Sequence, residues 1–331
     1  MIRSNGTKRV VLQELMLAGG HPAAGELIGE KGGVSRQSVW KAVEALRDDG
    51  YGIRSIPHKG YLLEELSPND LDPTMLENML YDCPWGHPVL YWPSLASTQE
   101  PLKEMARQNA PEGAVITADE QTRGRGRLGR NWESPPGGGL YFSLLMRPRI
   151  SPGNIQLVSL AAAMAVWESI LELFNISCDL KWPNDILFGE AKLCGILTET
   201  ASEPGKVHYA VTGIGLNANV NLRLAGASAR TASMIAITGK PVHRGRILSA
   251  IVKKLHHFVS ALENPEGARK LIEDYTKRCT TLGRKVRVVQ ETEDIFGKAV
   301  SLDERGALVV ESGGGRRVFA AADIVHLRQN Q

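Results

Sequence analysis

Apolar residues near the start of the chain recur at the spacing of short helices. They predict a first helix around residues 10–17, a short second helix at 24–30 and a third helix at 35–49, each followed by glycine. Two further apolar stretches, at 53–56 and 60–63, predict short strands joined by a three-residue turn. Three helices and a hairpin are the elements of a winged helix-turn-helix domain.

A second region mixes helices and strands and follows a polar linker at residues 67–70. The expected elements are strands at 89–92, 114–118 and 141–147, helices at 99–108 and 156–174, short glycine-bounded strands up to residue 220, and a helical segment at 246–276. This order of elements predicts a central domain of the α/β or α+β class.

The last region is composed of short apolar stretches separated by Gly or Asp turns. The expected strands are at 286–289, 298–301, 308–311, 318–320 and 324–327. They predict a small β-barrel. The sequence therefore indicates an α+β multidomain protein, and we divide it into residues 1–66, 67–278 and 279–331.

The charge balance restricts which partners the whole chain can have. The 331 residues include 39 Lys plus Arg and 36 Asp plus Glu, a formal net charge of +3. A protein that is basic throughout, such as a histone-like coat for nucleic acid, is excluded, whereas a small DNA-reading module is not. Hydrophobic residues make up 43% of the chain and charged residues 23%, which leaves ample apolar surface for a core.

Cysteine usage and the absence of apolar targeting segments favour the cytoplasm. The four cysteines are far apart in the sequence and have neither a C-x-x-C nor a partnered His spacing: Cys83, Cys178, Cys194 and Cys279. The apolar run at 10–17 is interrupted by polar residues, so it is not a signal-peptide core. The longest apolar stretch, 157–167, is shorter than the roughly 20 residues of a membrane span and predicts a buried helix. We expect a soluble, cytoplasmic protein without a membrane partner.

The third predicted helix offers donors for DNA. Residues 1–63 contain nine Lys or Arg against six Asp or Glu, a mild basic excess. Winged helices that bind DNA place donors for phosphates and base edges near the start of this helix. The candidate DNA-binding residues are Ser35, Arg36, Gln37, Trp40 and Lys41 of the helix, with His58 and Lys59 at the hairpin tip. The alternative is a winged helix that makes only protein contacts.

The most unusual stretch is an arginine- and glycine-rich segment. Residues 123–130 hold four Arg and three Gly, and Trp132 follows. Glycine lets a backbone approach a ligand closely, and arginine offers a permanently charged fork for carboxylate or phosphate. An RGG-like nucleic-acid segment or a plain basic loop is the alternative. Because the segment lies between two predicted strands, an anion-binding loop is favoured.

Other short motifs are weaker when each is taken alone. The sequence K-W-P-N-D at 181–185 is typical of a turn, and Lys192 begins a predicted buried strand where a surface lysine would be ordinary. The sequence S-T-Q-E at 97–100 matches a helix capping box as well as a ligand-binding turn. The sequence G-I-G-L-N at 213–217 follows a predicted strand, but it lacks the third glycine of a dinucleotide fingerprint.

Together, in order and in spacing, these motifs resemble those of the biotin protein ligases, specifically the bacterial form that also represses the biotin operon. The pattern E-Q-T-x-G-R-G-R-x-G-R-x-W is complete at 120–132, and K-W-P-N-D, K-L-x-G-I-L and G-I-G-x-N follow at 181–185, 192–197 and 213–217. The family's S-T-N appears here as Ser97-Thr98-Gln99, which puts a contact from Gln99 in doubt. The resemblance implies a central α/β domain shared with lipoate ligases and a C-terminal SH3-like barrel.

The resemblance also implies a two-step reaction. The biotin carboxylate attacks the α-phosphate of ATP to give biotinyl-5'-AMP, and a lysine of a biotin carboxyl carrier protein then takes the biotinyl group. Since the first nucleophile is already an anion, this chemistry needs charge neutralisation and positioning. The residues that the resemblance assigns to biotin are Ser97, Thr98, Gln121, Arg125, Gly126, Arg127, Lys192 and Gly195.

A second set is assigned to ATP and the adenylate: Arg125, Arg127, Arg130, Trp132, Lys181, Asn184 and Asn217. The catalytic candidates are Lys192, Arg125, Arg127 and Asp185, of which Asp185 either places Mg²⁺ or accepts a proton. The implied partners are the carrier protein of acetyl-CoA carboxylase and operator DNA, with a homodimer and biotinyl-5'-AMP as corepressor. Two alternatives are a lipoate- or octanoate-protein ligase, favoured by the glycines before Tyr141, and a ligand-sensing transcription factor without catalysis.

Overall fold

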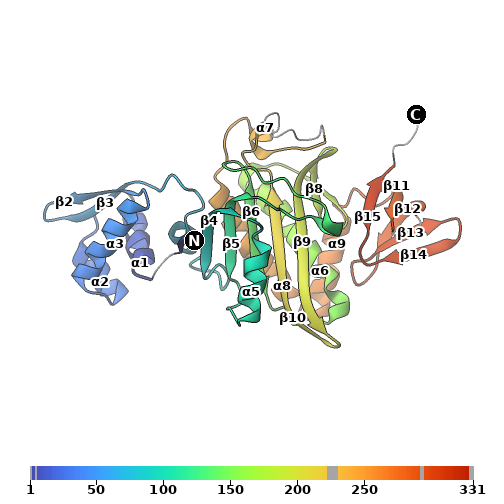
Figure 1. Cartoon of the computed structure of the whole chain (residues 1–331), viewed down its shortest axis with the longest axis horizontal. Helices are drawn as coiled ribbons and strands as arrows, with labels where there is room; N and C mark the ends of the chain where they lie inside the picture. The colour runs from blue at the N-terminus through green and yellow to red at the C-terminus, as the bar shows by residue number, and fades with distance from the viewer. Residues whose placement is uncertain (1, 4–5, 222–229, 291–293, 328–331) are drawn as a thin grey trace.

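The computed structural model describes residues 2–3, 6–221, 230–290 and 294–327, which form three units in a row along the long axis of the molecule (Figure 1). The N-terminal unit contains α1 (Gly6–Leu17), α2 (Gly25–Gly32) and α3 (Arg36–Asp48), followed by the antiparallel pair β2 (Gly52–Ile56) and β3 (Gly60–Glu65). The predicted winged helix-turn-helix is therefore confirmed.

Local sequence explains how the third helix of this unit begins. The Ser35 hydroxyl accepts a hydrogen bond from the Ser38 backbone N–H at 3.1 Å, as expected of an N-cap serine. The apolar face of α3 packs inward through Val39, Val43 and Leu46, all of which are buried in the small core of the unit. That leaves the opposite face of the helix in solvent.

A mixed sheet forms the middle of the molecule. Its strands run in the order β1-β4-β5-β6-β10-β9-β8-β7, and the neighbours β4 and β5 are parallel while the other pairs are antiparallel. The strand bounds are β1 (Ile2–Arg3), β4 (Val89–Leu95), β5 (Val115–Gln121), β6 (Leu140–Met146), β7 (Asp179–Lys181), β8 (Asp185–Phe188), β9 (Ala191–Glu203) and β10 (Lys206–Leu216).

Helices cover both faces of this sheet (Figure 1). One face packs against α5 (Gln99–Arg107), the crossover between the parallel strands β4 and β5. The other face packs against the long α6 (Gln156–Phe174), which in turn contacts α8 (Arg244–Ala261) and α9 (Pro265–Thr276). Shorter elements complete this unit: α4 (Pro73–Met79), η1 (Arg127–Gly129), η2 (Pro152–Asn154) and α7 (Met234–Thr238).

The helix α6 is the buried helix that the sequence predicts. By length and composition, the segment from Pro152 to Phe174 is apolar enough to cross a membrane, with a mean hydropathy of 1.7. In the folded chain, 67% of the most apolar 18-residue stretch of this segment is buried inside the protein. Its apolar character is therefore used in the core of the protein.

Two predictions for the central region are only partly right. Short strands are present as β7 and β8, but the strands that follow form one long hairpin, because β9 and β10 have 13 and 11 residues and contain glycines in their interiors. The helical segment at 246–276 is two helices, since Pro265 starts α9 and Asn264 caps it by accepting from the Glu266 N–H at 3.0 Å.

The C-terminal unit is the predicted small β domain. Its strands form an antiparallel sheet in the order β14-β13-β12-β11-β15. Their bounds are β11 (Lys285–Val289), β12 (Ile295–Leu302), β13 (Leu308–Ser312), β14 (Gly315–Phe319) and β15 (Asp323–His326). Apolar residues of this sheet, among them Val286 and Leu308, belong to the same continuous core as α6.

Contacts between the units bear on where the chain divides. Strand β1 pairs with β4 of the central sheet, and Met75 of α4 packs into the core of the N-terminal unit. The buried Tyr51 hydroxyl donates to Asp72 at 2.6 Å, across the linker. Elements on both sides of the expected boundary at residue 66 thus touch both units, and the exact division stays a prediction.

Candidate active site

A cavity of about 140 Å³ opens at the end of the central sheet where β5 leads into the arginine- and glycine-rich loop. The expected residues that line it are Ser97, Thr98, Gln121, Arg125, Gly126, Arg127, Arg130, Trp132, Asn184, Asp185, Lys192 and Gly195. They come from segments nearly a hundred residues apart, so the fold brings together most of the side chains that the sequence singles out.

Hydroxyl and amide groups form one end of this cavity. The Gln121 side-chain oxygen accepts from the Thr98 backbone N–H at 3.0 Å, and the Thr98 hydroxyl lies 2.7 Å from the Ser143 hydroxyl. The Gln121 amide nitrogen donates to the Ser134 hydroxyl at 3.0 Å. These side chains hold one another in place, with Ser97 buried beside them. Such an array suits the polar ring of a small ligand.

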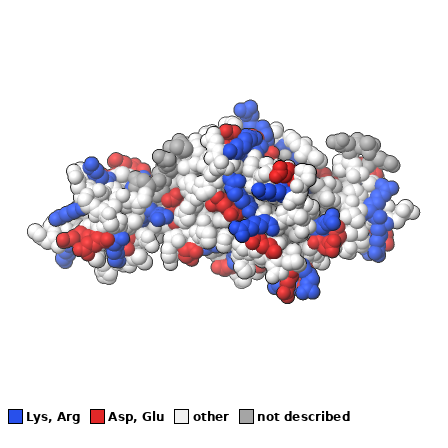
Figure 2. Space-filling model, turned by 90° about the horizontal axis from the view of Figure 1, so that it is seen from below, with Lys and Arg blue, Asp and Glu red and all other residues white. Residues whose placement is uncertain are grey.

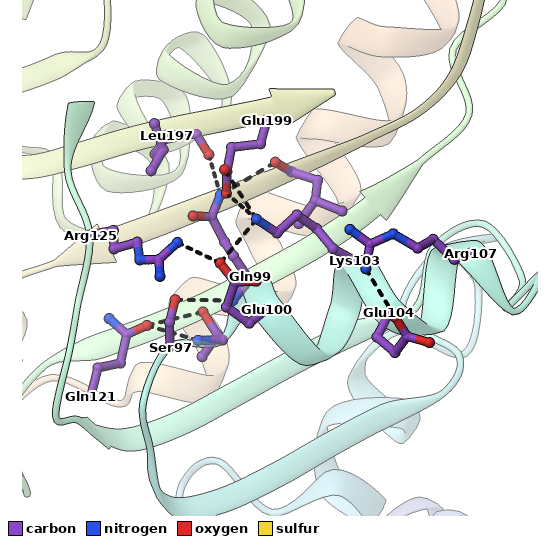
Figure 3. Close-up of polar contacts among 12 residues, drawn as sticks. Ser97, Gln99, Glu100, Lys103, Glu104, Arg107, Gln121, Arg125, Leu197 and Glu199 are labelled. Carbon is purple, nitrogen blue, oxygen red and sulfur yellow. Dashed lines mark hydrogen bonds and ion pairs between the residues drawn. The ribbon is translucent and has the colours of Figure 1, made fainter. Parts of the chain in front are cut away.

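Only half of the capping box expected at residues 97–100 is present. The Ser97 hydroxyl accepts from the Gln99 backbone N–H at 3.4 Å at the start of α5, but the Glu100 carboxylate points to Lys103 and Arg125 instead of back to the helix start (Figure 3). The reason is tertiary: the basic loop arrives beside the first turn of α5 and competes for the carboxylate.

The arginine- and glycine-rich loop folds back over the cavity. The Gly126 N–H donates to the Arg130 carbonyl at 2.7 Å, and the Trp132 N–H donates to the Gly124 carbonyl at 3.0 Å. A side chain at Gly124 would place its Cβ 2.3 Å from the Trp132 carbonyl oxygen, so this position requires glycine. Burial lowers the pKa of Arg127, whose side chain points inward more than those of its neighbours.

Two carboxylates bind the cations around the cavity. The Lys192 ammonium lies 2.7 Å from Asp185, on adjacent strands β9 and β8, and 5.2 Å from the centre of the Trp132 ring. Arg130 forms an ion pair with Asp323 of β15 in the C-terminal unit. The cavity wall therefore combines several cations with fewer anions, an arrangement that attracts a carboxylate or phosphate.

Glycines on β9 and β10 form the floor of the cavity. Gly195 and Gly215 pair with each other across the hairpin, and the Trp132 indole lies over both. A Cβ at Gly215 would be 2.5 Å from the indole nitrogen, closer than real Cβ contacts occur. The prediction that the stretch Gly213–Asn217 follows a strand is thus wrong, because Gly213 and Gly215 both lie inside β10. The Gln99 side chain occupies the space beside Gly213, and the Trp132 ring occupies the space beside Gly215.

Lys181 and Asn217 lie beside the cavity but do not line it. Lys181 of β7 lies opposite Asp185 of β8 in the antiparallel strand pair. Burial lowers the pKa of Lys181, and the nearby Lys192 charge acts in the same direction. The buried Asn217 donates its side-chain amide to the Ala232 carbonyl at 3.0 Å and its backbone N–H to Leu193. In this structure Asn217 fixes the backbone behind the floor of the cavity.

Sequence reasoning missed several residues of the wall. Asp323 is 131 positions from Lys192, and only the packing of the C-terminal unit brings it near Arg130. Gln99 turns its amide nitrogen toward the Leu197 carbonyl at 2.8 Å. The glycines at 213 and 215 were a signal that side chains approach the backbone there, since glycine inside a strand indicates close approach of another group.

A metal ion would have few protein ligands here. Among residues 2–3, 6–221, 230–290 and 294–327, no group of three or more His, Cys, Asp or Glu side chains is arranged to hold one. Mg²⁺ that accompanies a nucleotide needs only one or two carboxylates in addition to phosphate oxygens. Asp185, at the cavity wall beside Asn184, fits that limited requirement.

The candidate DNA-binding side chains are separate from this cavity. Arg36, Gln37 and Lys41 are exposed on α3, and 51% of the Trp40 surface is accessible. Lys59 is exposed in the turn between β2 and β3. Ser35 uses its hydroxyl as the helix cap, so its contribution to DNA would come from position rather than from a free side chain.

Figure 2 shows basic and acidic side chains interspersed over the central unit and a run of basic side chains over the C-terminal unit. This face is not one uniform positive field, in agreement with the net charge of +3.

Family models match all three units. Residues 7–62 match a helix-turn-helix domain, residues 91–217 match the biotin/lipoate A/B protein ligase family, and residues 281–327 match the biotin protein ligase C-terminal domain. The loop, the K-W-P-N-D turn and both floor glycines lie within the second of these matches.

Individual proteins match over most of the chain. The chain is 33% identical to the bifunctional ligase/repressor BirA of Bacillus subtilis (strain 168) over 313 residues, which cover 93% of this chain and 94% of that protein. It is 29% identical to BirA of Escherichia coli (strain K12), covering 90% and 91%. The structure resembles the biotin protein ligase from Aquifex aeolicus in complex with biotin and ATP, with a TM-score of 0.62 and 30% identity over 73% of this chain and 99% of that one. The chain belongs to the biotin protein ligase family, in the bifunctional ligase/repressor form with an N-terminal helix-turn-helix domain.

Proposed function

We propose that this protein is a cytoplasmic, ATP-dependent biotin protein ligase. The observation that carries the proposal is the convergence of Arg125, Arg127, Arg130 and Lys192 on a cavity whose other end is lined by hydroxyl and amide groups. Biotin has a carboxylate at one end and a polar ureido ring at the other, which this division of the cavity suits. The relatives with matching names support the same substrate.

In the first step, a biotin carboxylate oxygen bonds to the α-phosphorus of ATP, and the bond to the bridging oxygen of the β-phosphate breaks. Biotinyl-5'-AMP forms and pyrophosphate leaves. Lys192 would contact both the carboxylate and the α-phosphate, while Arg125, Arg127 and Arg130 neutralise the phosphates. Fixed cations act most strongly on charge that develops in a site shielded from water.

The remaining groups position the two substrates. Ser97, Thr98 and Gln121 would hydrogen-bond the ureido ring, with Gly126 and Gly195 allowing the ligand close to the backbone. Trp132, Asn184, Lys181 and Asn217 belong to the adenylate side. Asp185, which also orients Lys192, would hold a Mg²⁺ ion, and that ion would add to the neutralisation of the triphosphate.

In the second step, the amine of an acceptor lysine attacks the acyl carbon, the bond from that carbon to the phosphate oxygen breaks, and AMP leaves. The proton that the amine loses would pass to Asp185 or to water. The acceptor would be the biotin carboxyl carrier protein of acetyl-CoA carboxylase. Closure of the loop over the adenylate would exclude water, which otherwise hydrolyses it.

The deciding experiment measures pyrophosphate release and then transfer to a carrier domain. Release that depends on biotin, but not on lipoate or octanoate, supports biotin ligation. Release with lipoate or octanoate instead would identify the alternative ligase, for which the glycines at 137–139 are the supporting feature. Tight biotin binding without any release would indicate a ligand sensor without catalysis.

We further propose that the N-terminal unit represses biotin genes. The exposed Arg36, Gln37, Trp40, Lys41 and Lys59 would contact operator DNA, and a homodimer with bound biotinyl-5'-AMP would present two such units to two half-sites. A gel-shift titration with and without biotin plus ATP tests this: operator affinity should rise when both are present. An unchanged affinity and an unchanged oligomeric state would contradict the corepressor role.

A further inference from the structure

Arg125 of the loop has a carboxylate partner within the protein. Its guanidinium nitrogen Nη1 lies 2.6 Å from Oε1 of Glu100, in the first turn of α5 (Figure 3). The side chains of Arg125 and Glu100 are 55% and 45% exposed, so the pair lies at the mouth of the cavity rather than in the core. An anionic ligand that needs Arg125 must therefore compete with a carboxylate that is already bound.

Glu100 has a second cationic partner that does not belong to the loop. The Lys103 ammonium lies 3.0 Å from the same Glu100 oxygen and 3.1 Å from Glu199 of β9. The side chain of Lys103 is 14% exposed. Figure 3 shows the resulting row of alternating charges, from Arg125 through Glu100 and Lys103 to Glu199. Only the first member of this row belongs to the loop.

The helix that carries Glu100 is fixed to the sheet at its start. The Gln99 amide nitrogen donates to the Leu197 carbonyl at 2.8 Å, and its side chain crosses the hairpin at Gly213, where a Cβ would be 3.0 Å away. Together with the contact of Lys103 to Glu199, this ties the first turn of α5 to β9 and β10. Glu100 therefore stays in place if the loop moves.

We propose that Glu100 is a positioning residue that binds Arg125 in the ligand-free enzyme and releases it to the anionic substrate. This inference rests on the proposed function, in which Arg125 contacts the biotin carboxylate and the phosphates. The released Glu100 keeps its partner Lys103, so the exchange leaves no carboxylate without a cation. The loop is thus restrained until an anion of the right shape replaces Glu100.

The charge of Glu100 survives the exchange. The hydrogen bond from Lys103 is the main reason that the pKa of Glu100 lies below its usual range, and the Arg125 charge contributes less. Glu100 consequently remains an anion after Arg125 has left. An ion pair between side chains this exposed changes an equilibrium by roughly two- to five-fold. That is weak enough for a substrate anion with several cationic contacts to displace it.

The first test needs no substrate. Hydrogen–deuterium exchange of residues 122–132 is measured in the ligand-free full chain for the wild type, Glu100→Gln and the control Glu104→Gln. Glu104 lies on the same helix and pairs with Arg107 at 2.9 Å, so its substitution removes the same charge without touching the loop. We expect roughly two- to five-fold faster exchange in Glu100→Gln and wild-type exchange in the control.

A double variant shows whether Arg125 transmits this effect. In an Arg125→Gln background, Glu100→Gln should leave loop exchange unchanged, because the partner has already been lost. Equal exchange in Glu100→Gln and Glu104→Gln would overturn the proposal. A further acceleration in the Arg125→Gln background would also overturn it, since Glu100 would then act through other residues.

Biotin affinity provides the functional readout. Calorimetric titration should give a dissociation constant for biotin roughly two- to five-fold lower in Glu100→Gln than in Glu104→Gln, with the difference shrinking at high salt. Weaker binding in Glu100→Gln would mean that Glu100 orients Arg125 for the ligand, contrary to the proposal. If the wild type releases no biotin-dependent pyrophosphate, the proposed function fails, while the exchange experiment still decides what Glu100 does.

Discussion

Replacing Trp182 by Phe tests whether the K-W-P-N-D turn holds the C-terminal unit to the rest of the protein. The Trp182 side chain is 1% exposed, and its indole N–H donates to the Gly306 carbonyl, between β12 and β13, at 2.9 Å. Its backbone N–H is bonded to the Thr281 hydroxyl at 3.1 Å. The motif that the sequence connects with ATP thus contains a structural anchor.

The expected loss of stability follows from the missing indole N–H and the smaller size of the phenyl ring. A buried carbonyl left without its donor costs about 1–3 kcal/mol, and the lost ring atoms add about 1 kcal/mol of apolar burial. The Trp182→Phe variant should therefore be about 2–4 kcal/mol less stable. The measurement is urea unfolding followed by circular dichroism, compared through transition midpoints because a protein of several units need not unfold in one step.

The control is Trp40→Phe, which changes an indole that is 51% exposed on α3. Its stability should stay within about 0.5 kcal/mol of the wild type, as is usual for surface substitutions. If Trp182→Phe and Trp40→Phe shift the midpoint equally, the Trp182–Gly306 hydrogen bond does not anchor the C-terminal unit.

Three further predictions follow from the same structure. Lys192→Ala should lower kcat for biotin-dependent pyrophosphate release by about 10²–10³, because it removes a cation from the reacting groups and leaves Asp185 unpaired. Full activity would refute the role of Lys192 at the carboxylate and the α-phosphate. Gly215→Ala should displace Trp132 and raise the KM for ATP about tenfold. The control is Gly153→Ala, because a Cβ at Gly153 would meet no atom closer than 3.8 Å. An unchanged KM in Gly215→Ala would contradict the contact between Trp132 and the floor of the cavity. Burial, aided by the Lys181 and Arg284 charges, lowers the pKa of His326 to about 4 from 6.5. Since the unfolded chain takes up this proton first, the contribution of His326 to stability is present above pH 6.5 and lost as pH falls toward 4. His326→Asn should flatten the pH dependence of the unfolding midpoint in that window, and an unaltered profile would contradict the low pKa.

Local patterns were enough to predict the N-terminal unit. The cap at Ser35 and the apolar spacing of Val39, Val43 and Leu46 involve neighbours within one helix, so the sequence contains the whole argument. The long helix α6 was equally clear, because the eight residues from Leu160 to Trp167 are all apolar. In these segments, local preference and tertiary packing favour the same structure.

Predictions failed where a distant group decides what a residue does. Glycine ordinarily indicates a turn, but Gly213 and Gly215 lie inside β10 because Gln99 and Trp132 occupy the space that side chains would take. The S-T-Q-E sequence satisfies the capping-box pattern, yet the Glu100 carboxylate is bound by Lys103 and Arg125. Neither outcome can be read from a window of a few residues, since both depend on how the loop and the hairpin meet.

The cavity owes its construction to contacts between units rather than to any one motif. The C-terminal unit contributes Asp323, which binds Arg130 of the loop, and the Gly306 carbonyl, which holds Trp182 next to Asn184. Both contacts act on motifs of the central unit, and both come from outside it. Since the C-terminal unit shares its apolar core with α6, its position is fixed by burial of surface far larger than these two contacts. The C-terminal unit is consequently part of the wall of the candidate active site, although the arginines and Lys192 that give the cavity its charge all lie in the central unit.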